Sequence, residues 1–147
     1  MDQRRRMGFS GTHKGMTDHQ RQSLIYLLRE LVPNEFHHGD CIGSDAEAHM
    51  LVRDYSPATK IHIHPGHNYS GESPTRARMK GDVWYAPKHY LDRDWDIVIA
   101  TDYLVATPEK DREVLRSGTW ATLRRAKRLS KSYMILSRNS DKIVENF

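Results

Sequence analysis

The segment His38-Gly39-Asp40-Cys41-Ile42-Gly43-Ser44-Asp45 has the pattern of a turn that leads from a β-strand into a helix. Glycines bracket the turn, and Ser44 and Glu47 have the spacing of a capping box, which satisfies unpaired N–H groups at a helix start. We therefore expect residues 35–38 to form a short strand and Ser44 to open a helix that Pro57 closes. The inner face of this helix is expected to consist of Ala48, Leu51, Val52 and Tyr55.

The residues upstream repeat the alternation of strand and helix. Met7 to Ser10 is expected as a strand that ends at Gly11, and Thr17 with Gln20 forms a capping box for a helix that ends at Pro33. The apolar residues of that helix have the spacing of one buried face: Leu24, Leu27, Leu28 and Leu31.

The residues downstream continue this alternation. Strands are expected at residues 60–64, 103–107 and 133–137, and helices at residues 90–100 and 119–130. Residues 96–100 also suit a strand by their β-branched content, but we prefer a helix whose inner face is Leu91, Trp95 and Val98.

Two segments show no periodicity. Residues 65–88 contain several glycines and prolines and are expected as a long loop, either a binding segment or lid or a plain surface insertion. Residues 138–147 have no turn or capping pattern and are expected as a C-terminal tail.

These elements predict an α/β fold: a single Rossmann-like domain over residues 1–147, with its core in residues 6–137. About five parallel strands would form the sheet, with right-handed crossovers and helices on both faces. A chain of 147 residues favours one domain. Because such folds bind ligands beyond the carboxyl ends of the strands, the loops after the first, second and fourth strands are the expected site.

Composition narrows the classes of function. With 37% hydrophobic and 29% charged residues the chain has enough apolar content for a core, which argues against a disordered protein. The formal net charge of +4 favours an anionic partner. A single cysteine, Cys41, fits a reducing compartment, and no long apolar run or signal sequence is present, so we expect a cytoplasmic protein without a membrane partner.

Three loops at helix starts carry the candidate ligand-binding residues. A helix start offers free N–H groups and partial positive charge to a phosphate, although each loop can equally be a plain turn or cap. The candidates are Gly11, Thr12 and His13 in the first loop, Gly39, Gly43 and Ser44 in the second, and Arg116, Ser117, Gly118, Thr119 and Trp120 in the third, with Arg93 nearby.

Nine histidines invite a metal hypothesis. His62 and His64 would share one face of a strand, and His37 and His38 lie in the neighbouring strand. The spacing matches none of the common zinc patterns, so we expect no metal site and no cofactor. Cys41 is expected to be a buried thiol rather than a nucleophile.

At these loops the sequence resembles the small members of the SLOG superfamily, which unites LOG-type nucleotide phosphoribohydrolases with the DNA-processing proteins of natural transformation. Gly11-Thr12-His13 looks like their first-strand loop, and residues 38–45 look like their Gly-Gly-Ala-Arg-Gly-Ala-Asp segment. Arg93-Asp94 is similar to their Arg-Asn pair, and Gly118-Thr119 to the Gly-Thr of the LOG motif Pro-Gly-Gly-x-Gly-Thr-x-x-Glu. The resemblance extends from Gly8 to Leu136.

This resemblance implies a Rossmann-like sheet that binds a phosphorylated nucleotide, and a homodimer. The LOG branch hydrolyses the N-glycosidic bond of nucleoside monophosphates. The position of its catalytic Glu is Thr122 here, and a hydroxyl cannot replace that carboxylate. A substitute carboxylate would be one of Asp40, Asp45, Asp94 and Glu113.

Three hypotheses follow for the function. The first is a protein that binds a nucleotide or nucleotide derivative and hydrolyses its N-glycosidic bond. The second is a sensor or sequestering module for a nucleotide signal, such as an ADP-ribose derivative or a cyclic nucleotide. The third is nucleic-acid binding through the basic residues 4–6 and 124–128, although basic residues on a helix face are more often solvated surface.

Overall fold

The predicted alternation of strands and helices is present in the computed structural model, which describes residues 5–146. The helices are α1 (Asp18–Leu31), α2 (Ser44–Tyr55), α3 (Tyr90–Ala100) and α4 (Gly118–Arg128). The strands are β1 (Arg6–Gly11), β2 (Glu35–His38), β3 (Lys60–Ile63), β4 (Gly66–His67), β5 (Val83–Trp84), β6 (Lys88–His89), β7 (Tyr103–Thr107), β8 (Ser132–Leu136) and β9 (Ile143–Asn146). Arg4, in the basic N-terminal stretch, lies outside the described residues.

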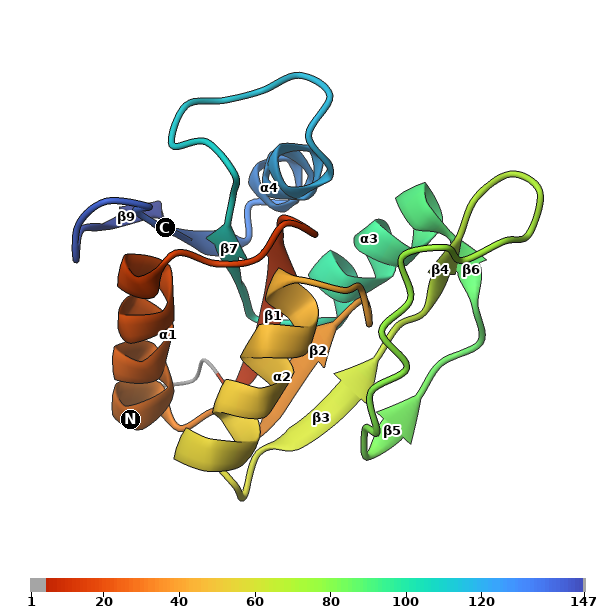
Figure 1. Ribbon diagram of the computed structural model, residues 1–147. Coiled ribbons are helices and arrows are strands. Elements are labelled where there is room, and N and C mark those ends of the chain that lie inside the picture. Colours follow the sequence, from red (N-terminus) through yellow and green to blue (C-terminus); the bar gives the residue numbers. More distant parts are fainter. Residues whose placement is uncertain (1–4, 147) are drawn as a thin grey trace.

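Within residues 5–146, seven strands form the main sheet in the order β5-β3-β2-β1-β7-β8-β9 (Figure 1). Neighbouring strands run parallel, except for the antiparallel pair β8 and β9. The predicted α/β fold with a mainly parallel sheet is confirmed. The predicted number of about five strands was too low, because residues 138–147 supply β9 at one edge of the main sheet and residues 65–88 supply β5 at the other. A two-residue strand has no periodicity that a sequence pattern can reveal.

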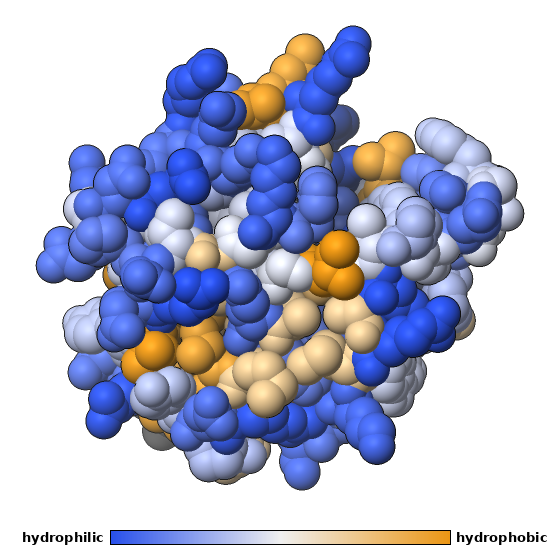
Figure 2. All heavy atoms as spheres, in the orientation of Figure 1, coloured by the Kyte–Doolittle hydropathy of each residue, from blue (hydrophilic) through white to orange (hydrophobic). Residues whose placement is uncertain are grey.

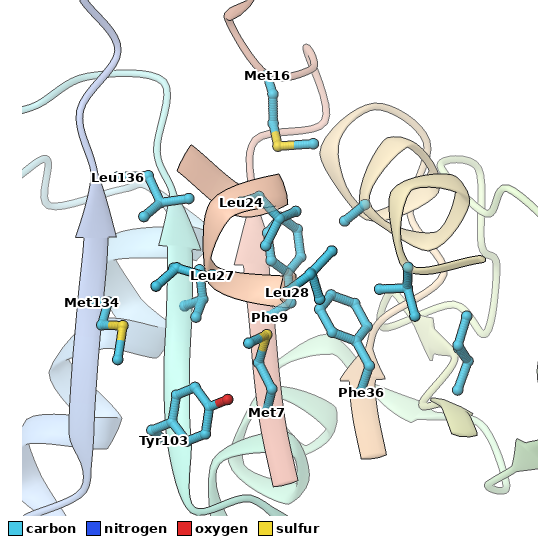
Figure 3. Close-up of a cluster of buried hydrophobic side chains, with 14 of the residues drawn as sticks. Met7, Phe9, Met16, Leu24, Leu27, Leu28, Phe36, Tyr103, Met134 and Leu136 are labelled. Atoms are coloured by element: carbon cyan, nitrogen blue, oxygen red, sulfur yellow. The ribbon is translucent and has the colours of Figure 1, made fainter. Parts of the chain in front are cut away.

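Helices cover both faces of the sheet, as predicted (Figure 1). Side chains alternate along β7: Tyr103 and Val105 join the core beneath α1 and α2, whereas Leu104 and Ala106 join the core beneath α3 and α4. Figure 3 shows the first core, with the α1 leucines turned toward the strands. A strand buried on both faces explains why β7 is apolar throughout.

The start of α1 is fixed by the predicted capping box. The N–H of Gln20 donates to Thr17 Oγ1 over 3.2 Å, and the N–H of Thr17 donates to Gln20 Oε1 over 3.0 Å. The amide Nε2 of Gln20 also donates to the carbonyl of Pro108, over 3.0 Å. The cap of α1 therefore also holds the beginning of the β7–α4 loop.

The predicted capping box of α2 is wrong. Ser44 donates its hydroxyl to the carbonyl of Thr12 over 2.7 Å, and Glu47 accepts from the N–H of Met16 over 2.7 Å. Gly43 is the N-cap residue, and it makes no side-chain cap. Both side chains instead tie α2 to the loop after β1.

Two predicted inner faces also need correction. Tyr55 of α2 and Leu91 of α3 are exposed, and Trp95 is only partly buried, beside Arg125. In α3 the buried positions are Arg93, Ile97 and Val98. Relative to the expected inner face, the first two buried positions of α3 lie two residues later in the chain, and the first of them is the charged residue Arg93.

The surface is mixed. Figure 2 shows hydrophilic residues over most of the face that carries α1 and α2, with hydrophobic residues in a band across its lower half. None of the helices in residues 5–146 has the length and hydrophobicity needed to cross a bilayer.

Leu24 tests the first core. Its side chain is fully buried, so Leu24→Ala should lower the free energy of unfolding by about 2–5 kcal/mol. Leu115→Ala is the matched control, because Leu115 is 83% exposed and its truncation should cost less than about 0.5 kcal/mol. Chemical denaturation followed by circular dichroism measures both; equal losses would contradict the assignment of the core.

Candidate functional site

The strand order changes direction between β1 and β7. From β1 the chain proceeds through β2 to β3 on one side, and from β7 it proceeds to β8 on the other. Ligands of open α/β sheets bind at such a switch point, beyond the carboxyl ends of the strands. A cavity of about 480 Å³ lies there, between the loops after β1, β2 and β7 and the helices α3 and α4.

Most of the predicted site residues line this cavity. They are Gly11, Thr12, His13, Gly39, Asp45, Arg93, Asp94, Arg116, Ser117, Gly118 and Thr119. Residues from all three predicted loops therefore meet in one place, together with the first turns of α3.

The start of α4 presents hydrogen-bond donors to the cavity. Ser117 caps the helix by accepting from the N–H of Trp120 over 3.2 Å. The N–H groups of Gly118 and Thr119 have no acceptor among residues 5–146. Arg116 is exposed, and no carboxylate within residues 5–146 pairs with it. This end of the cavity is therefore suited to an anion.

The loop after β1 is held by backbone contacts. The N–H of Thr12 donates to the carbonyl of Thr107 over 3.1 Å, which ties the ends of β1 and β7 together. A Cβ on Gly11 would overlap the side chains of Thr107 and Ser44, so the close approach requires glycine. Lys14 Nζ pairs at 2.8 Å with Oε1 of Glu109, a residue that lines the cavity. Lys14 is thus already engaged by a carboxylate.

The turn after β2 is organised around a buried carboxylate. Asp45 Oδ2 accepts from the N–H of Gly39 over 3.1 Å and from that of Cys41 over 3.2 Å. Gly43 has a φ of 82°, and a Cβ there would collide with the main chain of His13. Gly43 and Ser44 do not line the cavity, because both pack against the loop after β1.

Arg93 lies buried beneath the cavity, where its guanidinium is bonded to protein groups and is not free to bind a phosphate. Its Nε pairs with Asp94 Oδ1 at 2.7 Å, and its Nη1 donates to the carbonyls of Gly39 over 2.8 Å and His64 over 3.1 Å. The guanidinium therefore joins the ends of β2 and β3 to α3. Its donors are largely satisfied within the protein.

The pKa values of three residues that line the cavity, Asp45, Asp94 and Cys41, are raised. Burial raises the pKa of Asp45 to about 6, although Arg93 and the N–H groups that it accepts act in the opposite direction. Burial also raises the pKa of Asp94, against the opposing effect of Arg93. Burial raises the pKa of Cys41 to about 12, which keeps this residue a neutral thiol, as expected of a non-nucleophilic cysteine.

Three further candidates lie outside the cavity. Asp40 is buried but turned away, since it accepts from the N–H of Met79 over 2.9 Å and pairs with Arg76 at 3.2 Å. Glu113 pairs with Arg124 at 2.8 Å on the surface. Trp120 donates its indole N–H to the carbonyl of Lys110 over 3.2 Å and so holds the β7–α4 loop.

Some lining residues gave no usable signal in the sequence. Thr75 comes from the 65–88 segment and reaches the cavity because the N–H of Ile42 donates to its carbonyl over 2.7 Å. Tyr90 opens α3 and places its ring 5.4 Å from Arg93 Cζ. Both placements depend on long-range contacts, which local patterns do not encode.

The raised pKa of Asp45 predicts how the free energy of unfolding depends on pH. Between its ordinary value of 3.8 and about 6, the folded state holds a proton that the unfolded state releases, so this group's contribution to stability falls as pH rises through that window. From pH 4 to pH 7.5 the wild type should lose on the order of 1–3 kcal/mol relative to Asp45→Asn.

The control for this experiment is Asp54→Asn, which removes an exposed carboxylate from the same helix. Urea denaturation across the pH range measures all three proteins. Parallel stability curves for the wild type and Asp45→Asn would contradict the buried, high-pKa carboxylate.

Comparison with known proteins supports the fold. No family model and no curated protein sequence matches the chain. Among solved structures, the molybdenum cofactor binding protein of Rippkaea orientalis superposes with a TM-score of 0.65 at 13% identity, over 92% of this chain and 77% of that one. DNA processing protein A (DprA) of Streptococcus pneumoniae superposes with a TM-score of 0.64 at 16% identity, over 88% of this chain. The match covers only 49% of the DprA chain. The chain thus shares the Rossmann-like α/β fold of these two proteins, which is the fold class expected from the sequence.

Proposed function

We propose that this protein binds a nucleotide or a nucleotide derivative in the cavity between β1 and β7. The observation that carries the proposal is the pair of features that line this cavity: donors and positive charge at the start of α4, and the carboxylates of buried Asp45 and partly buried Asp94. A volume of about 480 Å³ suits a ligand of nucleotide size.

The start of α4 would hold the phosphate. The N–H groups of Gly118 and Thr119 are available there, and the helix adds partial positive charge. Arg116 precedes the helix and can add a bidentate contact. Open space lies where a Cβ of Gly118 would stand, so the main chain is approachable.

The carboxylates would hold the sugar or the base. A carboxylate accepts hydrogen bonds from ribose hydroxyls and from amino groups, but repels phosphate. The ligand would therefore have one orientation, with its phosphate toward α4 and its hydroxyls toward Asp45 and Asp94. One solved neighbour is named for binding a cofactor and the other for processing DNA, which is compatible with a small-molecule or nucleic-acid partner.

A second proposal is hydrolysis of the N-glycosidic bond of the bound nucleotide. Its support is the presence of two carboxylates in one cavity, of which Asp45 has a pKa of about 6. A carboxyl group with a pKa near neutrality can act as a general acid, while its neighbour stabilises positive charge on the sugar. Of the four candidate carboxylates, Asp45 and Asp94 are the ones that line the cavity.

Binding is tested first. Native mass spectrometry of the purified protein, followed by denaturation and identification of released small molecules, gives ligand class and stoichiometry, including any homodimer. Calorimetric titration then measures affinity for nucleoside monophosphates, diphosphates and ADP-ribose. Arg116→Ala should weaken binding about 10- to 150-fold, the equivalent of one charge-assisted hydrogen bond of about 1.5–3 kcal/mol.

The matched control is Arg112→Ala, which removes an exposed arginine from the same loop but outside the cavity. It should bind like the wild type. Equal effects of both variants, or none from either, would move the site away from the start of α4. Affinity for oligonucleotides alone, falling steeply with salt, would instead support nucleic-acid binding.

Turnover is tested separately. If the chain hydrolyses its ligand, chromatography should detect free base, and Asp94→Asn should abolish its release in a variant that circular dichroism shows to be folded. Asp111→Asn, at an exposed carboxylate of the β7–α4 loop, controls for a general loss of charge. A wild-type protein that binds a nucleotide and returns it intact would eliminate the hydrolase and leave the sensor.

A further inference from the structure

A second cluster of polar side chains lies on the sheet face that α3 and α4 cover elsewhere. His37 of β2 and His62 of β3 are direct neighbours in the register of the two parallel strands. Glu35 precedes His37 by two residues and therefore points to the same face. The ligand atoms of these three residues all lie within 4.8 Å of one another.

The geometry of the cluster is that of a preformed ligand set. The rings of His37 and His62 stack with their centroids 4.2 Å apart. Both Nε2 atoms approach the same carboxylate oxygen, Glu35 Oε1, at 2.8 Å and 3.6 Å. Ligands about 2.0–2.1 Å from a tetrahedral zinc ion are separated by roughly 3.3 Å, so small side-chain shifts would accommodate an ion.

The second nitrogen of each ring is also held. His37 Nδ1 lies 2.8 Å from Nε2 of His64, and His62 Nδ1 lies 2.9 Å from the hydroxyl of Tyr85. Each neutral ring can donate Nδ1–H to this partner and leave the Nε2 lone pair for an ion. Such outer partners fix the tautomer and orientation of metal-binding histidines.

The cluster is buried except on the side of Glu35. The side chain of His37 is 1% exposed, that of His62 12% and that of Glu35 33%. An ion can enter beside Glu35, and water can complete its coordination there. Two imidazoles with one carboxylate favour zinc and related transition ions over magnesium or calcium, which prefer oxygen ligands.

We infer that Glu35, His37 and His62 form a binding site for one divalent transition-metal ion, with His64 and Tyr85 as positioning residues. The sequence pattern favoured no metal site, because its three ligands are brought together from two strands and match no local spacing. The ion would link β2 to β3 and, through Tyr85, fix the segment after β5. This inference does not depend on the proposed nucleotide site.

The experiment uses the full chain, freed of metal by dialysis against a chelator. Calorimetric titration with ZnCl₂ should show one ion per chain, and the thermal midpoint should rise with zinc. Titration with CoCl₂ should give visible absorption bands of a nitrogen and oxygen site, without a thiolate charge-transfer band. A thiolate band would assign the metal to Cys41 and overturn the inference.

Variants locate the site. Glu35→Gln and His62→Gln alter partly exposed ligands and should abolish the stoichiometric binding, whereas Tyr85→Phe should weaken it about 10- to 100-fold. His89→Gln is the control, because His67 and His89 form a second histidine pair outside the cluster. Circular dichroism checks that each variant is folded. A wild type that binds no zinc or cobalt, or binding lost in His89→Gln and kept in His62→Gln, would overturn the inference.

Discussion

The buried guanidinium of Arg93 is the interaction on which this architecture depends. It reaches the carbonyls at the ends of β2 and β3 and pairs with Asp94 in its own helix. Burial alone would lower the pKa of Arg93, but the charges of Asp94 and Asp45 around it raise the pKa above its ordinary value. The group therefore stays charged, and removal of Asp94, its direct ion-pair partner, would leave a buried charge that is less well compensated.

Arg93 also explains why certain neighbours are small. A Cβ on Gly39 would overlap the guanidinium, and one on Gly66 would overlap the ring of Tyr90, which lies against Arg93. The glycine after β2 is thus required by an arginine 54 residues later in the chain. Sequence patterns assigned Gly39 to ligand binding; it lines the cavity, and its carbonyl also accepts from Arg93 and so serves the packing of α3.

Local signals in the sequence were sufficient for the four helices and for β1, β2, β3, β7 and β8. They were insufficient for the strands within residues 65–88, for β9 and for side-chain roles. The capping box of Thr17 and Gln20 placed α1 correctly because both partners lie within one helical turn. Ser44 and Glu47 have the same spacing but bond to the loop after β1, since that loop packs against them. The same limit applies to Asp40, whose partners come from the 65–88 segment, and to the convergence of Glu35, His37 and His62.

The cluster of Glu35, His37 and His62 is connected to the cavity through His64. The ring of His64 shares a hydrogen bond with His37 of this cluster, while the main-chain carbonyl of His64 accepts a hydrogen bond from Arg93 beneath the cavity. Within residues 5–146, α4 packs mainly on β1, β7 and β8, and α3 mainly on β1, β4 and β6. The outer face of β2 and β3 is therefore covered by Tyr85 and its neighbours instead of a helix. A polar face there is stable only if its groups are mutually hydrogen-bonded. The register of β2 against β3 meets that requirement and, through His64 and Arg93, also fixes one wall of the cavity.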